Sequence, residues 1–86
     1  MLADRYIYPA ILHFADDGIS VKFPDFPGCF SYGDNELHAV KNAKEALELH
    51  IFGLEDDSEP IPSPSLIRDI TVKENETVVM IDTTHN

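Results

Sequence analysis

Residues 23–29, with the sequence FPDFPGC, constrain the fold more than any other part of this chain. Pro27 presets its own φ and Gly28 accepts a positive φ, so the pair suits the middle of a type II turn. The run therefore predicts a tight connection between two short strands.

Alternating apolar residues on both sides of this connection predict three strands. Residues 6–14 are apolar on both strand faces, as in a strand that is covered on two sides. Pro9 conflicts with full pairing there, and a bulge or an unpaired stretch before Ala10 would remove the conflict. Residues 15–18 (ADDG) predict a turn into a half-buried strand over residues 19–23, and residues 29–32 predict a short third strand.

A 3.6-residue apolar period then predicts one long helix, which begins after an N-cap at Asp34 or Asn35 and ends near Phe52 or Leu54. Its expected buried stripe has five members, with three further residues beside it: Val40, Ala43, Leu47, Ile51 and Leu54, flanked by Ala39, Ala46 and His50. A proline-rich connection over about residues 58–65 follows. Residues 65–70 predict a single helical turn or an irregular segment, and residues 77–82 a final strand.

This order of elements predicts an α+β domain: a three-stranded antiparallel meander, one long helix packed on one face, and a final strand that returns beside the first. One helix cannot cover both faces of a sheet, so the second apolar face of the first strand is expected to need another protomer or a partner. With 86 residues the chain is expected to be one domain with a thin core. Because oligomerisation would reinforce such a core, we expect a dimer or a tetramer.

The charge balance narrows the choice of partner. The chain contains sixteen Asp and Glu residues but only six Lys and Arg residues, which gives a formal net charge of −10. Such a surface repels nucleic acid and attracts basic proteins, although acidity can also serve solubility alone. The single cysteine, Cys29, excludes an internal disulfide, and no apolar run approaches the ~20 residues of a membrane span. A cytoplasmic protein that does not enter the membrane is the expectation.

The residues that could carry catalysis are better explained by structural roles. Cys29 follows a predicted Pro-Gly turn and fits a buried small apolar residue. The four histidines, at positions 13, 38, 50 and 85, do not have metal-ligand spacing on one helix. The aspartates at positions 16, 17, 25 and 34 could together hold Mg²⁺, but each suits a turn or a helix cap. We therefore expect no catalytic residues, no metal site and no cofactor, with a metal-dependent nuclease as the less favoured alternative.

The chain resembles the HicB family of antitoxins over nearly its whole length. The matching segments occur in the family's order: residues 8–10 (YPA), 16–18 (DDG), 21–29 (VKFPDFPGC), 33–34 (GD), 42–50 (NAKEALELH), 59–65 (EPIPSPS) and 78–82 (VVMID). The resemblance implies a partial ribonuclease H-like fold. It also implies that the protein is not an enzyme but binds and neutralises a small basic, mRNA-cleaving toxin of the HicA type.

Many relatives carry a C-terminal DNA-binding module. Residues 1–86 are expected to form a single HicB-like domain without that module, so DNA is expected as a partner only for a longer chain. A stand-alone oligomeric module without a toxin partner is the main alternative function.

Seven residues at predicted loops and strand ends are the expected toxin-binding surface, because charged rims around aromatic anchors are typical of interfaces. They are Asp16, Asp17, Asp25, Phe26, Tyr32, Asp34 and Glu36. For Phe26 and Tyr32, a contact in the core or between protomers is an equal alternative.

Overall fold

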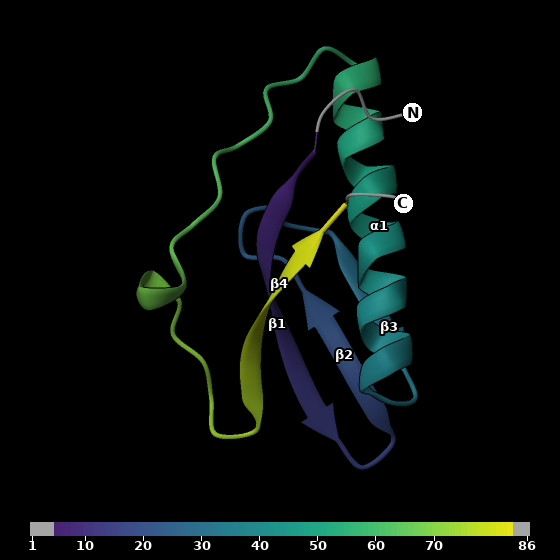
Figure 1. The fold of residues 1–86 in the computed structure, drawn as a ribbon, viewed down its shortest axis with the longest axis vertical. Coiled ribbons are helices and arrows are strands. Elements are labelled where there is room, and N and C mark those ends of the chain that lie inside the picture. The colour runs from purple at the N-terminus through teal and green to yellow at the C-terminus, as the bar shows by residue number, and fades with distance from the viewer. Residues whose placement is uncertain (1–4, 84–86) are drawn as a thin grey trace.

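A computed structural model describes residues 5–83 as a four-stranded antiparallel sheet with one long helix. The elements in chain order are β1 (Ile7–Ala15), β2 (Gly18–Lys22), β3 (Phe30–Gly33), α1 (Glu36–Asp56), the 3₁₀-helix η1 (Ile67–Asp69) and β4 (Glu76–Asp82). The strand order is β3-β2-β1-β4, with every neighbouring pair antiparallel. Figure 1 shows α1 along one side of the sheet and the connection, residues 57–75, leading from the end of α1 back to the start of β4. The predicted α+β order is confirmed.

The core lies between α1 and one face of the sheet. It is built from alternate residues of β1, β2 and β4 and from a stripe of α1 residues spaced four apart: Tyr8, Ala10, Leu12, Ile19, Val21, Ile81, Ala39, Ala43, Leu47 and Ile51. The predicted stripe is wrong at Val40, which is 38% exposed, whereas Ala39 is fully buried. The reason is a close approach: a Cβ on Gly33 would overlap the backbone of Ala39, so only glycine lets α1 contact β3 there.

Pro9 lies within β1 without breaking the sheet. Phe14 N donates to Asn75 O at 2.9 Å, so even-numbered residues of β1 direct their backbone groups toward β4. Because this direction alternates along a strand, Pro9 faces the β2 side. There β2 ends at Lys22, opposite Ile11. Pro9 therefore lies beyond the end of β2. The stretch before Ala10 is unpaired on that side, as in one of the two predicted solutions, but it is paired with β4 on the other side.

The second face of the sheet is partly covered by the chain itself. Pro9 and Ile11 point away from α1, yet Pro9 is less than 2% exposed and Ile11 only 6%. Residues of the connection between 65 and 71 line a cavity together with Ile11. The expectation that this face needs another protomer is therefore wrong for Pro9 and Ile11. Phe30 and Met80, on the same face, are exposed.

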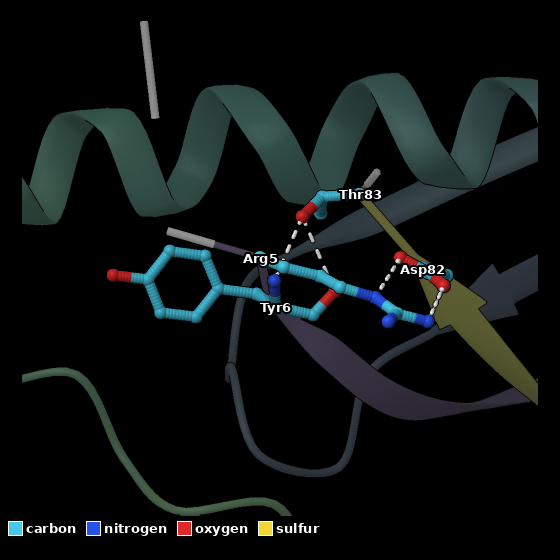
Figure 2. A network of polar contacts seen from close by, with 4 residues as sticks. All are labelled: Arg5, Tyr6, Asp82 and Thr83. Atoms are coloured by element: carbon cyan, nitrogen blue, oxygen red, sulfur yellow. Dashed lines mark hydrogen bonds and ion pairs between the residues drawn. The ribbon is translucent and has the colours of Figure 1, made fainter. Parts of the chain in front are cut away.

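Polar contacts close the end of the β1–β4 ladder (Figure 2). The Arg5 guanidinium donates to both carboxylate oxygens of Asp82, at 3.2 and 2.6 Å. The Thr83 hydroxyl oxygen accepts from Tyr6 N at 3.0 Å, and the hydroxyl donates to Tyr6 O at 3.2 Å. Thr83 is buried, and these bonds satisfy its hydroxyl group.

A candidate protein-binding surface at the acidic end

Four of the predicted interface residues gather at one end of the molecule. Asp16 and Asp17 lie in the turn between β1 and β2, and Asp34 and Glu36 lie at the N-terminal end of α1. Figure 1 places this turn and the start of α1 at the same end of the fold. All four residues are exposed. We call this set (Asp16, Asp17, Asp34 and Glu36) the acidic end.

Tyr32 joins the two halves of the acidic end. Its hydroxyl donates to the backbone oxygen of Asp17, and its own backbone oxygen accepts from Asn42 Nδ2 of α1 at 2.8 Å. Gly18 has a φ of +143°, and a Cβ there would overlap the Tyr32 ring. The ring is thus held in place, while the residue stays 48% exposed. Such a fixed aromatic residue can serve as an anchor for a partner.

The helix start places the other two carboxylates. Asn35 is the N-cap: its Oδ1 accepts from His38 N at 2.9 Å, and its backbone oxygen accepts from Ala39 N at 2.9 Å. The sequence left Asp34 and Asn35 as alternatives for this cap. Negative charge at a helix N-terminus is favourable because the helix dipole is positive there. Asp34 and Glu36 can therefore support α1 and face solvent at once.

Asp25 does not belong to this surface. Its Oδ2 accepts from Ser65 N at 3.0 Å and its Oδ1 from the Ser65 hydroxyl at 2.5 Å. The carboxylate is half-buried and holds the connection against the turn between β2 and β3. This turn follows the end of β2 that points away from the hairpin with Asp16 and Asp17 (Figure 1). The predicted grouping of Asp25 with the other carboxylates is therefore wrong.

Phe26 is a core residue. It is 2% exposed, and its ring centroid lies 4.6 Å from that of Tyr8 and 5.3 Å from that of His50, edge to face in both cases. A turn directs it inward, because Phe26 N donates to Phe23 O at 3.1 Å. Of the two alternatives that the sequence left for Phe26, the core contact is the correct one. The ring has almost no surface to offer a partner.

Two features bear on catalysis. Cys29 is 4% exposed, and burial raises the pKa of its thiol, which disfavours the nucleophilic thiolate. Within residues 5–83, the structure contains no group of three or more His, Cys, Asp or Glu side chains that could hold a metal ion.

In the same part of the chain, no helix has the length and apolar character needed to span a membrane.

Sequence reasoning missed a cavity on the second face of the sheet. Its volume is about 570 Å³, and its lining includes Ile11, Lys22, Phe30 and Ile70. The available signal was the alternation in β3, which puts Phe30 and Tyr32 on one face, opposite the face that packs on α1. What the sequence could not show is that the connection would return to form the other wall.

A family model matches most of the chain. The model of the HicB_like antitoxin of bacterial toxin-antitoxin system matches residues 8–84. An uncharacterized 14.9 kDa protein from Haemophilus phage HP1 (strain HP1c1) is 42% identical over 84 residues. That match covers 92% of this chain and 63% of the phage protein, so the chain spans less than two thirds of that relative's length.

Solved structures share the fold. A chain of the HicA3 and HicB3 toxin-antitoxin complex superposes with a TM-score of 0.70 at 33% identity, covering 87% of this chain and 94% of that one. A chain of a toxin-antitoxin complex from Streptococcus pneumoniae gives a TM-score of 0.84 at 20% identity, covering 92% of this chain and 69% of that one. At 20% identity the second likeness concerns the fold alone.

Proposed function

This chain belongs to the HicB-like antitoxin family of bacterial toxin-antitoxin systems, and we propose that it neutralises a small basic toxin of the HicA type by direct contact at its acidic end. In this proposal the protein acts by binding and not by catalysis. The observation that carries the site is the exposure of Asp16, Asp17, Asp34 and Glu36 at one end of the fold, where the Tyr32 hydroxyl bonds the backbone of Asp17.

Charge supports a basic partner. A toxin that cleaves RNA needs cationic groups to hold phosphates, and an acidic surface can occupy the same groups. The chain carries a net charge of −10, and the acidic end concentrates four carboxylates at the tips of two adjoining elements. Tyr32 supplies a large ring whose position is set before binding, and this preorganisation lowers the entropic cost of association.

The experiment that tests this proposal is co-expression with a small basic toxin of the HicA type, together with measurement of binding by the purified proteins. The wild type should restore growth. One variant neutralises the acidic end, and a matched control neutralises four exposed carboxylates elsewhere. The test variant is Asp16→Asn, Asp17→Asn, Asp34→Asn, Glu36→Gln, and the control is Glu45→Gln, Asp56→Asn, Glu59→Gln, Glu74→Gln.

Both variants lose the same net charge, so a general effect of acidity would weaken both equally. The test variant should lose most of its protection and affinity, while the control should keep both. Failure of the wild type to bind or to protect against the toxin would refute the function. Equal binding by the two variants would refute the site and leave the function standing.

A metal-dependent nuclease is not favoured. Its predicted carboxylates do not converge, because Asp25 is bonded to Ser65 beyond the far end of β2, away from Asp16 and Asp17. RNA that stays intact after incubation with the purified chain and Mg²⁺ is the expected result.

A further inference from the structure

A row of side chains crosses the sheet face that points away from α1. Lys22 of β2 pairs with Ile11 of β1 on one side and with Phe30 of β3 on the other, so these three side chains are neighbours on that face. The connection supplies the facing wall, and Ile70 is its apolar member. Sheet and connection together enclose the cavity of about 570 Å³.

The cavity has the size and the lining of a small-molecule site. Such sites usually enclose roughly 300–1,000 Å³ and are mostly apolar, with a few polar groups that orient the ligand. Here Ile11, Phe30 and Ile70 provide apolar surface. Phe30 is 66% exposed, so its side chain still has area that a ligand can cover. The cavity therefore favours a ligand with an apolar body.

A smaller hollow of about 280 Å³ adjoins this cavity. The two share Ile11, Lys22 and Phe30 in their lining, so Lys22 lies where they meet. The smaller hollow adds Lys73, which precedes β4, and the hydrogen-bonded pair of His13 and Glu76. We call the two hollows, lined by these residues and Ile70, the lysine groove.

The lysine groove holds positive charge in a chain that has little of it. Lys22 and Lys73 are two of only six Lys and Arg residues, and the chain has a net charge of −10. Among residues 5–83, the structure gives neither lysine an ion pair. Both ammonium groups are therefore available to an anion.

Two carboxylates also line the lysine groove, and they direct an anion toward the smaller hollow. The Glu76 side chain is only 6% exposed, and its oxygens lie 2.9 Å from Lys73 N and 3.0 Å from His13 Nδ1. Its charge is thus already hydrogen-bonded within the fold. Asp69 is exposed, but it lines the larger cavity and not the smaller hollow. An anionic group is therefore favoured between Lys22 and Lys73, away from Asp69.

We propose that the lysine groove binds a small organic anion, in which an aromatic or aliphatic body carries a carboxylate or sulfonate group. The body lies in the larger cavity against Phe30 and Ile70, and the anionic group meets Lys22 and Lys73. An inorganic anion would leave the apolar wall uncovered. A basic toxin would meet two ammonium groups here, so this inference does not rest on the proposed function.

The first measurement is a fluorescence titration of the purified chain with anilinonaphthalene sulfonate, an aromatic sulfonate. The wild type should bind this probe saturably and one-to-one, and added salt should weaken the binding because it screens the lysines. Phenylnaphthylamine, which has the same rings without the sulfonate, is the uncharged comparison.

Lys22→Gln combined with Lys73→Gln tests the charged part of the lysine groove. The affinity for the sulfonate should fall by about tenfold or more, because charge-assisted hydrogen bonds are lost. The affinity for phenylnaphthylamine should not change. Lys41→Gln combined with Lys44→Gln is the matched control: it removes the same charge from α1 and should leave both affinities unchanged.

Phe30→Ser tests the apolar part, and it should weaken the binding of both probes. Leu49→Ser changes a comparably exposed apolar residue of α1, at 73%, and should affect neither probe. Circular dichroism of each variant checks that the fold is retained, as expected for substitutions at exposed positions.

Three results would overturn the inference. The first is a wild type without saturable binding of the sulfonate. The second is an equal affinity for the sulfonate in the wild type and in the variant that lacks Lys22 and Lys73. The third is a loss of binding with Leu49→Ser but not with Phe30→Ser, because it would place the probe on α1. None of these measurements involves a toxin, so the inference can fail while the proposed function stands.

Discussion

The acidic end and the turn between β2 and β3 both pair an aspartate with an aromatic residue, and the structure uses the two pairs in opposite ways. At the acidic end Tyr32 is 48% exposed and Asp34 faces solvent. In the turn Phe26 is 2% exposed, and Asp25 is bonded through both oxygens to Ser65, forty residues later in the sequence. The same residue types thus build a surface in one region and the fold in the other.

The difference arises from what each region contacts. The internal bond at the acidic end uses the Tyr32 hydroxyl and the backbone of Asp17, so it leaves the Asp17 carboxylate available. At the turn, the returning connection supplies two donors that occupy the Asp25 carboxylate. The turn between β2 and β3 holds the chain together, because the Asp25 carboxylate is hydrogen-bonded to Ser65. The acidic end is suited to binding, because its carboxylates are exposed. Substitutions in the two regions should therefore separate stability from affinity.

Phe26→Ala should be the most destabilising of these changes, by about 3–5 kcal/mol, because it empties a packed position between Tyr8 and His50. Tyr32→Ala should cost clearly less, since half of that residue already faces water. Chemical denaturation of both variants measures the difference. Equal losses in the free energy of unfolding would contradict the assignment of Phe26 to the core and Tyr32 to the surface.

Asp25→Ala should cost about 2 kcal/mol, because it removes the acceptor of two hydrogen bonds to a charged group. Ser65→Ala should cost less, since the bond from the Ser65 backbone N–H survives. Asp34→Ala should cost less than about 1 kcal/mol, which is its share of the helix dipole. Unfolding midpoints in denaturant give the ranking. If Asp34→Ala proved as costly as Asp25→Ala, Asp34 would be a residue that stabilises the fold and not only a surface residue.

Asp17→Asn combined with Asp34→Asn should leave stability within about 1 kcal/mol of the wild type. The same variant should slow association with a basic toxin, on the order of tenfold at low salt, and weaken the salt dependence of the rate. Stopped-flow measurements at several salt concentrations test this. Asp56→Asn combined with Glu59→Gln, which removes two exposed charges elsewhere, should change the rate less.

Glu76 is a third carboxylate whose charge is used within the fold, and its effect should depend on pH. The Lys73 N–H, and then the His13 ring, hold the pKa of Glu76 below its usual value of 4.5. A lowered folded-state pKa stabilises the protein above the unfolded pKa, and this stabilisation is lost as pH falls through the folded-state pKa. Glu76→Gln should thus lower the melting temperature slightly at neutral pH, with the deficit shrinking below about pH 4. Thermal unfolding across pH measures this, and a deficit independent of pH would rule out the charge as its cause.

Local chemistry in the sequence was enough to predict most of the framework. Gly28 adopts the positive φ (91°) that the Pro-Gly turn required, and Cys29 N donates to Phe26 O across that turn at 3.0 Å. The apolar period located α1 and three of its four fully buried residues, with the error at Val40 and Ala39. These features depend on neighbours a few residues away, so a sequence pattern records them directly. The resemblance to the HicB family likewise rested on local runs and is confirmed by the family match.

Tertiary structure alone decided how the acidic and aromatic residues are used. The sequence could not show that the connection would return to bond Asp25, help cover Ile11 and leave β4 open at the edge. These outcomes depend on contacts between segments tens of residues apart, and an aspartate in a turn has the same local preferences whether or not a distant serine meets it. The sequence by itself therefore determined the elements and the family. The packing of the connection against the sheet decided that the Asp25 carboxylate is occupied, while the carboxylates of the acidic end stay exposed.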